Sequence, residues 1–200
     1  MKDYSKVFKV FKNNYKPIPL EVFGSNKYKT LISTVMSART NDNTTLAAAK
    51  RLFKVAPNFS ELNKLEVKSI EKLIYPVGFY KIKAKHIKLL TEKVLKDFNG
   101  KVPGTFKKLI TLPGVGRKTA NLVLNRAFNI PAIAVDTHVH RISNLLGWVH
   151  TKNPEQTEKE LIKTVPKKYW NDMNRLFVGI GRQFTSKKKL IKFLKREKLI

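Results

Sequence analysis

LPGVGRKTANLVLNRAFNIPAIAVDTHVHR, residues 112–141, carries the strongest structural signals in this sequence. A Pro-Gly-Val-Gly turn separates a short helical segment, FKKLITL at 106–112, from a second helix that starts near Arg117. Pro113 and Gly114 turn the chain, and Gly116 is expected to turn it again. Glycine adopts positive φ readily and leaves no side chain between the backbone and an approaching partner. The stretch therefore predicts two helices joined by a tight turn whose backbone is open to a ligand.

The start of the second helix is a candidate phosphate-binding site. The first amide N–H groups of a helix have no partner within the helix, and they carry the positive end of its dipole. Such a turn can bind a phosphate oxygen without any side chain, and Arg117 and Lys118 add positive charge beside it. The alternative is an ordinary corner between two helices of an α-bundle.

Lys118 can be read as a nucleophile or as one more solvated or phosphate-contacting lysine. A lysine attacks only in its neutral form, and a reference pKa of ~10.4 leaves a few molecules in ten thousand neutral at pH 7. Lowering that pKa by ~3 units requires about 4 kcal/mol of destabilisation of the charged form, from burial and neighbouring positive charge. A position just inside a helix N-terminus disfavours positive charge, so it acts in the required direction.

Asp136 follows the apolar run AIAV and precedes THVHRISNLL, so it is well placed to cap the next helix. Capping needs only one carboxylate oxygen, and the other oxygen stays available for chemistry. His138 and His140 do not predict a metal pair, because side chains at i and i+2 on a helix diverge.

Charge points to a polyanionic partner. The 200 residues include 41 Lys and Arg against 14 Asp and Glu, a formal net charge of +27, which favours nucleic acid over mere solubility. The chain has no cysteine, which excludes disulfides, thiol catalysis and thiolate-bound metals. The N-terminal segment lacks the apolar core of a signal peptide, and no run of about 20 apolar residues predicts a membrane span. We expect a soluble, intracellular protein.

The fold class predicted is all-α, because apolar residues recur at helical spacing through nearly every segment. The one β-like run, IPAIAV at 130–135, is too short and isolated to form a sheet. Asp42 or Asn43 is expected to cap the helix that ends before Pro57, and Pro166 is expected in the first turn of a helix at 167–182. The other helices are predicted at 28–38, 67–75, 81–98, 106–112, 117–128, 137–146 and 154–164, and from about Ser186.

The hairpin, its lysine and the aspartate together resemble the endonuclease III family of helix-hairpin-helix DNA glycosylases. LPGVGRKTANLVL and AVDTHVHR carry the resemblance, and the pairing is more specific than either motif alone. It extends through MSARTND (36–42), VGFYKIKAKHI (77–87) and NGKVPGTFKKLITLPGVG (99–116), and more weakly to FVGIGRQF (177–184). It therefore covers most of the chain.

The resemblance implies a base-excision repair enzyme. By match, Lys118 attacks C1′ of a damaged nucleotide flipped out of the duplex, and Asp136 assists it. The implied activity removes oxidised pyrimidines from double-stranded DNA and then cleaves 3′ of the abasic site by β-elimination from a Schiff base. Two alternatives stay open. One is a different lesion, either thymine or uracil opposite guanine or an oxidised purine. The other is a non-catalytic, structure-specific DNA-binding module, which would need neither Lys118 nor Asp136.

The resemblance also implies which residues contact DNA. Arg39 and Phe79 match the two positions that wedge into the duplex, where the family often has glutamine and leucine. Arginine prefers guanine-type acceptors, so the preference for the opposite base can differ here. An alternative for Phe79 is a core position, and one for Arg39 is a phosphate contact. The remaining DNA contacts implied by match are Gly114, Val115, Gly116, Arg117 and His138.

Further expectations follow from the same resemblance. Two helical lobes, a six-helix lobe at 24–134 and a discontinuous lobe at 1–23 plus 135–200, would flank a cleft that contains the active site. Backbone oxygens of Ile110, Leu112 and Val115 could bind a monovalent cation, and no catalytic metal is expected. The family's [4Fe–4S] cluster cannot form without cysteine, and a C-terminal helix containing LIKFLK is expected to replace it by packing and to offer lysines to DNA. The protein is expected to act as a monomer, in the cytoplasm and at the nucleoid of a prokaryotic-type cell.

Overall fold

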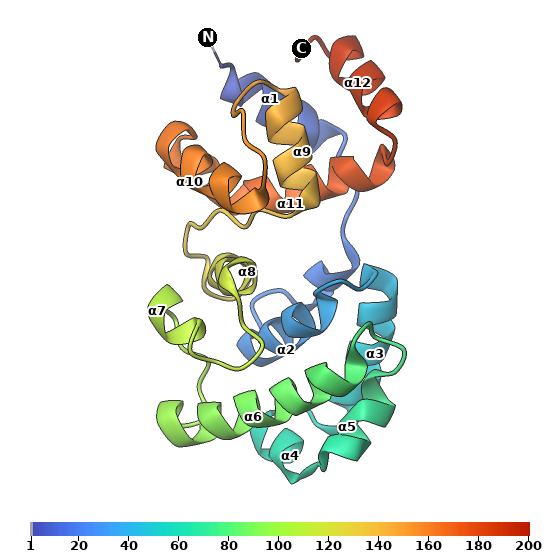
Figure 1. The fold of residues 1–200 in the computed structure, drawn as a ribbon, viewed down its shortest axis with the longest axis vertical. Helices are drawn as coiled ribbons and strands as arrows, with labels where there is room; N and C mark the ends of the chain where they lie inside the picture. Colours follow the sequence, from blue (N-terminus) through green and yellow to red (C-terminus); the bar gives the residue numbers. More distant parts are fainter. Residues whose placement is uncertain (1) are drawn as a thin grey trace. The chain divides into compact units, whose positions relative to one another are not determined.

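The computed structural model describes residues 2–200, and each regular element in that range is a helix (Figure 1). The predicted all-α class is confirmed, and IPAIAV forms an extended connection without strand pairing in the described chain. The chain divides into two compact units. A central unit is Pro19–Ile130, and a terminal unit combines Met1–Ile18 with Pro131–Ile200. No helix in the described part is long and apolar enough to cross a membrane.

The central unit is built around a helix that is buried on nearly all sides. This helix, α2 (Lys27–Ser37), places Leu31, Ile32 and Met36 away from solvent. It packs against α8 (Arg117–Phe128), α3 (Asp42–Val55) and α6 (Tyr80–Phe98). The unit is completed by η1 (Pro19–Phe23), α4 (Phe59–Lys64), α5 (Val67–Ile74) and α7 (Phe106–Leu109).

The structure differs from the local predictions in this region in two places. Asn41, rather than Asp42 or Asn43, caps α3, and its side chain accepts a 2.8 Å hydrogen bond from the Asn43 N–H. Asn41 has the extended backbone that a cap requires, whereas Asp42 already lies in the first turn, where its charge favours the helix dipole. The six-residue helix α4 was not predicted, since only Phe59 and Leu62 bury apolar surface in it.

The terminal unit has an aromatic core. It consists of α1 (Tyr4–Asn13), α9 (Thr137–Leu145), α10 (Pro154–Thr164), η2 (Lys167–Tyr169), α11 (Trp170–Gln183) and α12 (Lys187–Arg196). Phe8 stacks on Tyr169 at a centroid distance of 4.4 Å, and Phe11 meets Phe177 edge-on at 5.1 Å. The helix predicted at 167–182 starts later in the structure, at Trp170, after a 3₁₀ turn. Pro166 precedes that turn as its cap and does not lie in the first turn of a helix.

Two glycines of α11 allow its neighbours to approach closely. A Cβ built at Gly181 would lie 2.2 Å from Nδ1 of His138 on α9, and one at Gly179 would lie 2.8 Å from the ring of Tyr15. No side chain fits at either separation. The glycines in FVGIGRQF therefore serve helix packing within the terminal unit.

The C-terminal helix α12 packs through an apolar face, as its sequence predicted. Ser186 caps it, and Leu190, Phe193 and Leu194 are buried. Phe193 stacks on Phe184 at 4.5 Å. Arg141 of α9 fixes the joint between α11 and α12 by donating to the carbonyl oxygens of Gly181, Phe184 and Thr185. Packing and hydrogen bonds thus hold α12 against α9 and α11.

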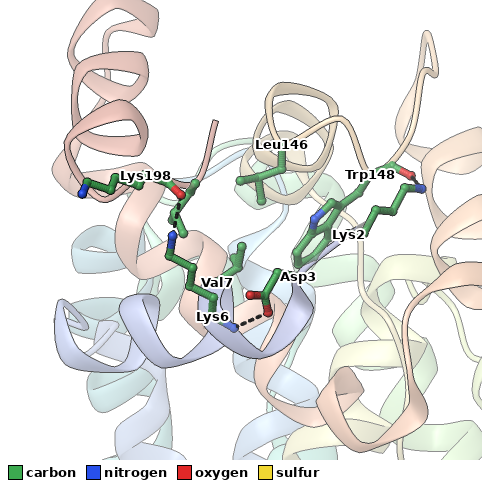
Figure 2. A pocket seen from close by; sticks show the side chains of 8 residues that line it. Lys2, Asp3, Lys6, Val7, Leu146, Trp148 and Lys198 are labelled. Carbon is green, nitrogen blue, oxygen red and sulfur yellow. Dashed lines mark hydrogen bonds between the residues drawn. The ribbon is translucent and has the colours of Figure 1, made fainter.

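The two ends of the chain meet in the terminal unit around a hollow of about 450 Å³ (Figure 2). Its lysines bind backbone carbonyls: Lys6 Nζ donates to the Lys198 carbonyl at 2.7 Å, and Lys2 Nζ donates to the Trp148 carbonyl. Asp3 caps α1 by accepting from the Lys6 N–H at 2.9 Å. The bond from Lys6 to Lys198 connects the first helix to the C-terminal tail beside this hollow.

Candidate active site

The predicted hairpin is formed by α7, a tight turn and α8. Thr105 caps α7, and the Val115 N–H donates to the Leu112 carbonyl at 3.1 Å to close the turn. Leu112 and Val115 are buried, and they anchor the turn in the central unit. Arg117 is the first residue of α8, and its guanidinium lies 5.2 Å from the centre of the Phe106 ring on α7.

The two glycines of the turn are needed for different reasons. Gly114 has a φ of +78°, and a Cβ there would lie 3.1 Å from Cβ of His86, so both backbone and space require glycine. Gly116 was expected to turn the chain, and its φ of −91° and ψ of 179° are values that any residue adopts. Apart from the neighbouring residues in sequence, a Cβ at Gly116 would meet no atom of the described chain within 4 Å. The free space lies at the start of α8, which is the predicted phosphate-binding position.

We expect Gly114→Ala to lower stability, and Gly116→Ala to weaken DNA binding without a loss of stability. Gly114→Ala should lower the free energy of unfolding by more than ~1 kcal/mol, because alanine is strained at positive φ. Gly116→Ala should leave unfolding within about 0.5 kcal/mol of wild type and weaken duplex binding, because the methyl group occupies the approach to the N–H groups of α8. Thermal unfolding and DNA titration at one fixed salt concentration check both. Unchanged affinity in Gly116→Ala would contradict a phosphate contact at this turn.

Lys118 is the second residue of α8, and its side chain is exposed. Within residues 2–200 its ammonium has no hydrogen-bond or ion-pair partner. The burial considered in the sequence analysis is therefore absent. Lys118 lies in the first turn of α8, next to Arg117. An amine without a partner at this place is accessible to an electrophile that approaches the turn.

Asp136 caps α9, as its position predicted. Its Oδ1 accepts hydrogen bonds of 2.9 Å from the N–H groups of His138 and Val139. Both bonds use the same oxygen, and Oδ2 has no hydrogen-bond partner in the part of the chain that the structure describes. One residue can therefore cap the helix and present a carboxylate oxygen. Asp136 lies in the terminal unit, and Lys118 lies in the central unit.

The two histidines of α9 serve the terminal unit. His138, predicted to contact DNA, packs its half-buried ring against Gly181. His140 Nδ1 lies 2.6 Å from Oγ1 of Thr157, which links α9 to α10. The described residues contain no cluster of three His, Cys, Asp or Glu residues suited to a metal.

The candidate cation ligands Ile110, Leu112 and Val115 follow α7 in the hairpin. Carbonyl oxygens suit hard cations, and the Leu112 oxygen, which already accepts the Val115 N–H, has a second lone pair. The turn is thus chemically compatible with a cation. An iron–sulfur cluster does not fit this chain, because a cluster of that kind needs thiolates and the sequence has no cysteine.

Arg39 and Phe79 come together in the central unit, 40 positions apart in sequence. Both side chains are exposed, and the Arg39 guanidinium lies 5.9 Å from the centre of the Phe79 ring. The alternative of a core position for Phe79 is therefore wrong. A third residue beside them, Lys83, was missed because lysines are common here. The signal that could have found it is its spacing, since Lys83 falls in phase with the buried Ile87, Leu90 and Val94.

Residues 32–167, more than half of the chain, match the HhH-GPD superfamily of base excision DNA repair proteins. The chain belongs to this superfamily. Among its members it is 43% identical over 178 residues to endonuclease III of Thermotoga maritima, covering 89% of this chain and 80% of that protein. It is 41% identical over 160 residues to endonuclease III-like protein 1 of Gallus gallus, covering 78% of this chain and 57% of that protein.

Solved structures agree with this placement in the HhH-GPD superfamily. A trapped covalent intermediate of endonuclease III with DNA, in an estranged-adenine complex, is 33% identical and superimposes with a TM-score of 0.78 over 91% of this chain and 84% of that one. A non-covalent endonuclease III–DNA complex is 30% identical, with the same TM-score, over 94% of this chain and 90% of that one. The protein is thus a DNA glycosylase of base excision repair, of the endonuclease III type.

Proposed function

We propose that this protein removes oxidised pyrimidines from double-stranded DNA and cleaves the strand at the resulting abasic site, with Lys118 as nucleophile and Asp136 as its helper. The observation that supports this most is the amine of Lys118, which is exposed in the first turn of α8 beside the open backbone at Gly116. A protein that only bound DNA would need charge at this place, and it would not need a lysine without a partner next to a phosphate-binding turn.

The first chemical step would replace the base by the enzyme. The neutral amine of Lys118 attacks C1′, the C1′–N bond breaks, and the base leaves with the bonding electrons and takes up a proton. Positive charge develops on the sugar as the bond breaks, and the Oδ2 carboxylate oxygen of Asp136 would stabilise that charge and carry the proton. The C1′–O4′ bond then opens, O4′ takes a proton, and the lysine nitrogen and C1′ form an iminium.

The second step would cleave the strand. The iminium draws electrons from C2′, which acidifies its hydrogen, and a base removes that proton. The electrons of the C2′–H bond form a C2′–C3′ double bond, and the C3′–O bond breaks, which releases the 3′ phosphate. Water then hydrolyses the imine, which regenerates Lys118 and leaves an unsaturated aldehyde on the other DNA end. No metal is needed in this sequence of steps.

The hairpin would place the sugar in reach by binding its backbone phosphates. Gly116 leaves the first N–H groups of α8 accessible, and Arg117 lies at the same helix start. The net charge of +27 adds attraction to the duplex that does not depend on sequence. We also propose that backbone oxygens of Ile110, Leu112 and Val115 bind a monovalent cation there, which would bridge the turn to a phosphate.

The wedge pair, Arg39 and Phe79, would fill the gap left by the flipped nucleotide. Flipping costs a few kcal/mol of lost stacking and pairing, and an inserted side chain offsets part of it. Phe79 offers a flat apolar ring for stacking. Arg39 can donate two parallel hydrogen bonds to the O6 and N7 acceptors of guanine, so we propose guanine as the favoured opposite base.

A panel of duplexes that each carry one lesion tests the lesion class. The panel contains thymine glycol and 5-hydroxycytosine as oxidised pyrimidines, uracil and thymine opposite guanine, and 8-oxoguanine. We expect release of both oxidised pyrimidines, with single-turnover rates at least about 10-fold above those of the other lesions, because each pocket contact is worth ~1–3 kcal/mol. Preferred release of uracil, thymine or 8-oxoguanine would replace the lesion assignment. Binding without release of any base would indicate a DNA-binding module.

A further inference from the structure

The wedge pair has a strained backbone at both of its residues. Arg39 has a φ of +52° and Phe79 a φ of +58°, the left-handed region that bulky side chains rarely occupy. Phe79 is also 59% exposed, so burial of its ring does not explain its conformation. Strain of this kind persists only where the surrounding contacts enforce it, and it concentrates at functional sites.

The two loops that carry the wedge pair contact each other directly. The Gly78 N–H donates to Oγ1 of Thr40 at 3.1 Å. A Cβ at Gly78 would lie 2.8 Å from the carbonyl oxygen of Arg39, so only glycine permits this approach. The residues next to Arg39 and Phe79 in sequence therefore join the two loops. This contact alone is one partly buried hydrogen bond, which is too little to enforce two strained residues.

Lys83 supplies the remaining contacts from inside the fold. It lies one turn into α6, where its backbone N–H donates to the Phe79 carbonyl at 3.0 Å. Its Nζ donates to the Met36 carbonyl at 2.7 Å, to the Ala38 carbonyl, and to Oγ1 of Thr40 at 3.0 Å. An ammonium has three N–H groups, and all three are used on the segment that contains Arg39. Lys83 thus connects the segment around Arg39 to the residue that begins α6.

Lys83 is a costly way to make these contacts. Its side chain is 6% exposed and, in the described chain, has no carboxylate partner. Burial lowers the pKa of Lys83 to about 8, which reflects the cost of removing its charge from water. An apolar residue would fit the row of buried side chains formed by Ile87, Leu90 and Val94 on α6 without this cost. What lysine adds is three directed hydrogen bonds to the last carbonyls of α2 and to Thr40.

We propose that Lys83 is a positioning residue that holds Arg39 and Phe79 together as one preformed wedge before DNA binds. The proposal rests on the proposed function, in which this pair enters the duplex. Loops that are already ordered lose less conformational entropy when they insert into the duplex. More of the binding free energy is then available to extrude the nucleotide. Without Lys83 the two loops relax, and the hairpin chemistry at Lys118 stays intact. The effect of Lys83 should therefore depend on whether the substrate is stacked in a duplex.

Borohydride trapping on an abasic site, in a duplex and in the same strand alone, tests this. We expect Lys83→Met to lower the trapping rate on the duplex by about 10- to 100-fold, because misplaced inserting groups cost rates of this order. On the single strand, where no base stack must be opened, the rate should stay within about two-fold of wild type. Lys85→Met is the matched control, since Lys85 is exposed two residues further along α6 and the change in charge is the same.

A fluorescent readout separates the wedge from the chemistry. With 2-aminopurine opposite the abasic site, wild-type binding should raise the emission as the orphaned base unstacks, and Lys83→Met should reduce that rise. Phe79→Ala should show the same reduction, and the double variant should show no further loss. If wild type fails to trap on both substrates, the proposed chemistry of Lys118 fails, and the fluorescence of the variants still decides the role of Lys83.

A second, milder variant tests the same role in case Lys83→Met disturbs the fold. Thr40→Val removes the hydroxyl that binds both Lys83 and Gly78 and leaves the two carbonyl contacts of Lys83 in place. It should lower duplex trapping by about 3- to 10-fold without loss on the single strand, because two hydrogen bonds between the loops are lost, one from Lys83 Nζ and one from the Gly78 N–H. Equal losses on both substrates in either variant, or no loss on the duplex, would overturn the positioning role.

Discussion

Lys118→Gln is expected to abolish covalent trapping on an abasic duplex and to lower strand cleavage by at least ~10³-fold, because an amide nitrogen cannot form an imine. The measurement is borohydride trapping under single-turnover conditions, followed by a denaturing gel that separates the protein–DNA adduct from free strand. Binding should persist, because the turn and Arg117 remain. Stability should change by less than about 0.5 kcal/mol, since the side chain is exposed.

Charge alone must be separated from nucleophilicity in this experiment. Lys107→Gln is the matched control, since Lys107 is an exposed lysine on α7 of the same hairpin and the variant loses the same single charge. It should bind DNA somewhat more weakly at low salt and trap at a rate within about three-fold of wild type, as expected for one phosphate contact. Trapping that persists in Lys118→Gln would mean that another amine is the nucleophile. Peptide mapping of the adduct would then identify that amine.

Local signals predicted most helices, because the apolar period and the caps are both visible in the sequence. Thr105, Ser186 and Asp136 cap their helices as their positions suggest, and Asn99 ends α6 in the left-handed conformation. The errors arose where two similar residues compete within one turn. Asn41 takes the cap that was expected at Asp42 or Asn43, since the choice depends on where the backbone leaves the extended region.

Features that depend on tertiary contacts could not be read from the sequence. Lys83 looks like its neighbours in KIKAKHI, and only packing shows that its ammonium lies under the loop of Arg39. The strained φ of Phe79 is likewise set by contacts from a segment 40 residues away. Gly116 shows the reverse error. This glycine was expected to turn the chain, whereas the structure has an extended backbone at Gly116 and open space beside it.

Asp136→Asn and Asp136→Ala together separate the two roles of this side chain. Asparagine caps helices about as well as aspartate, and its amide oxygen can accept the same N–H groups of His138 and Val139. We therefore expect Asp136→Asn to unfold within about 0.5 kcal/mol of wild type, and Asp136→Ala to lose ~1 kcal/mol. Both variants should lose about 10²- to 10⁴-fold in the rate of base release, because neither can carry a proton or a negative charge.

The comparison rests on base release and unfolding measured on the same three proteins. Release of an oxidised pyrimidine under single-turnover conditions reports the chemistry, and thermal unfolding reports the cap. If Asp136→Asn releases the base at the wild-type rate, the carboxylate has no catalytic role and Asp136 is a cap alone. If only Asp136→Ala loses activity, and does so in proportion to its lost stability, the loss comes from a frayed α9. A full loss in Asp136→Asn without loss of stability leaves the Oδ2 charge as the cause.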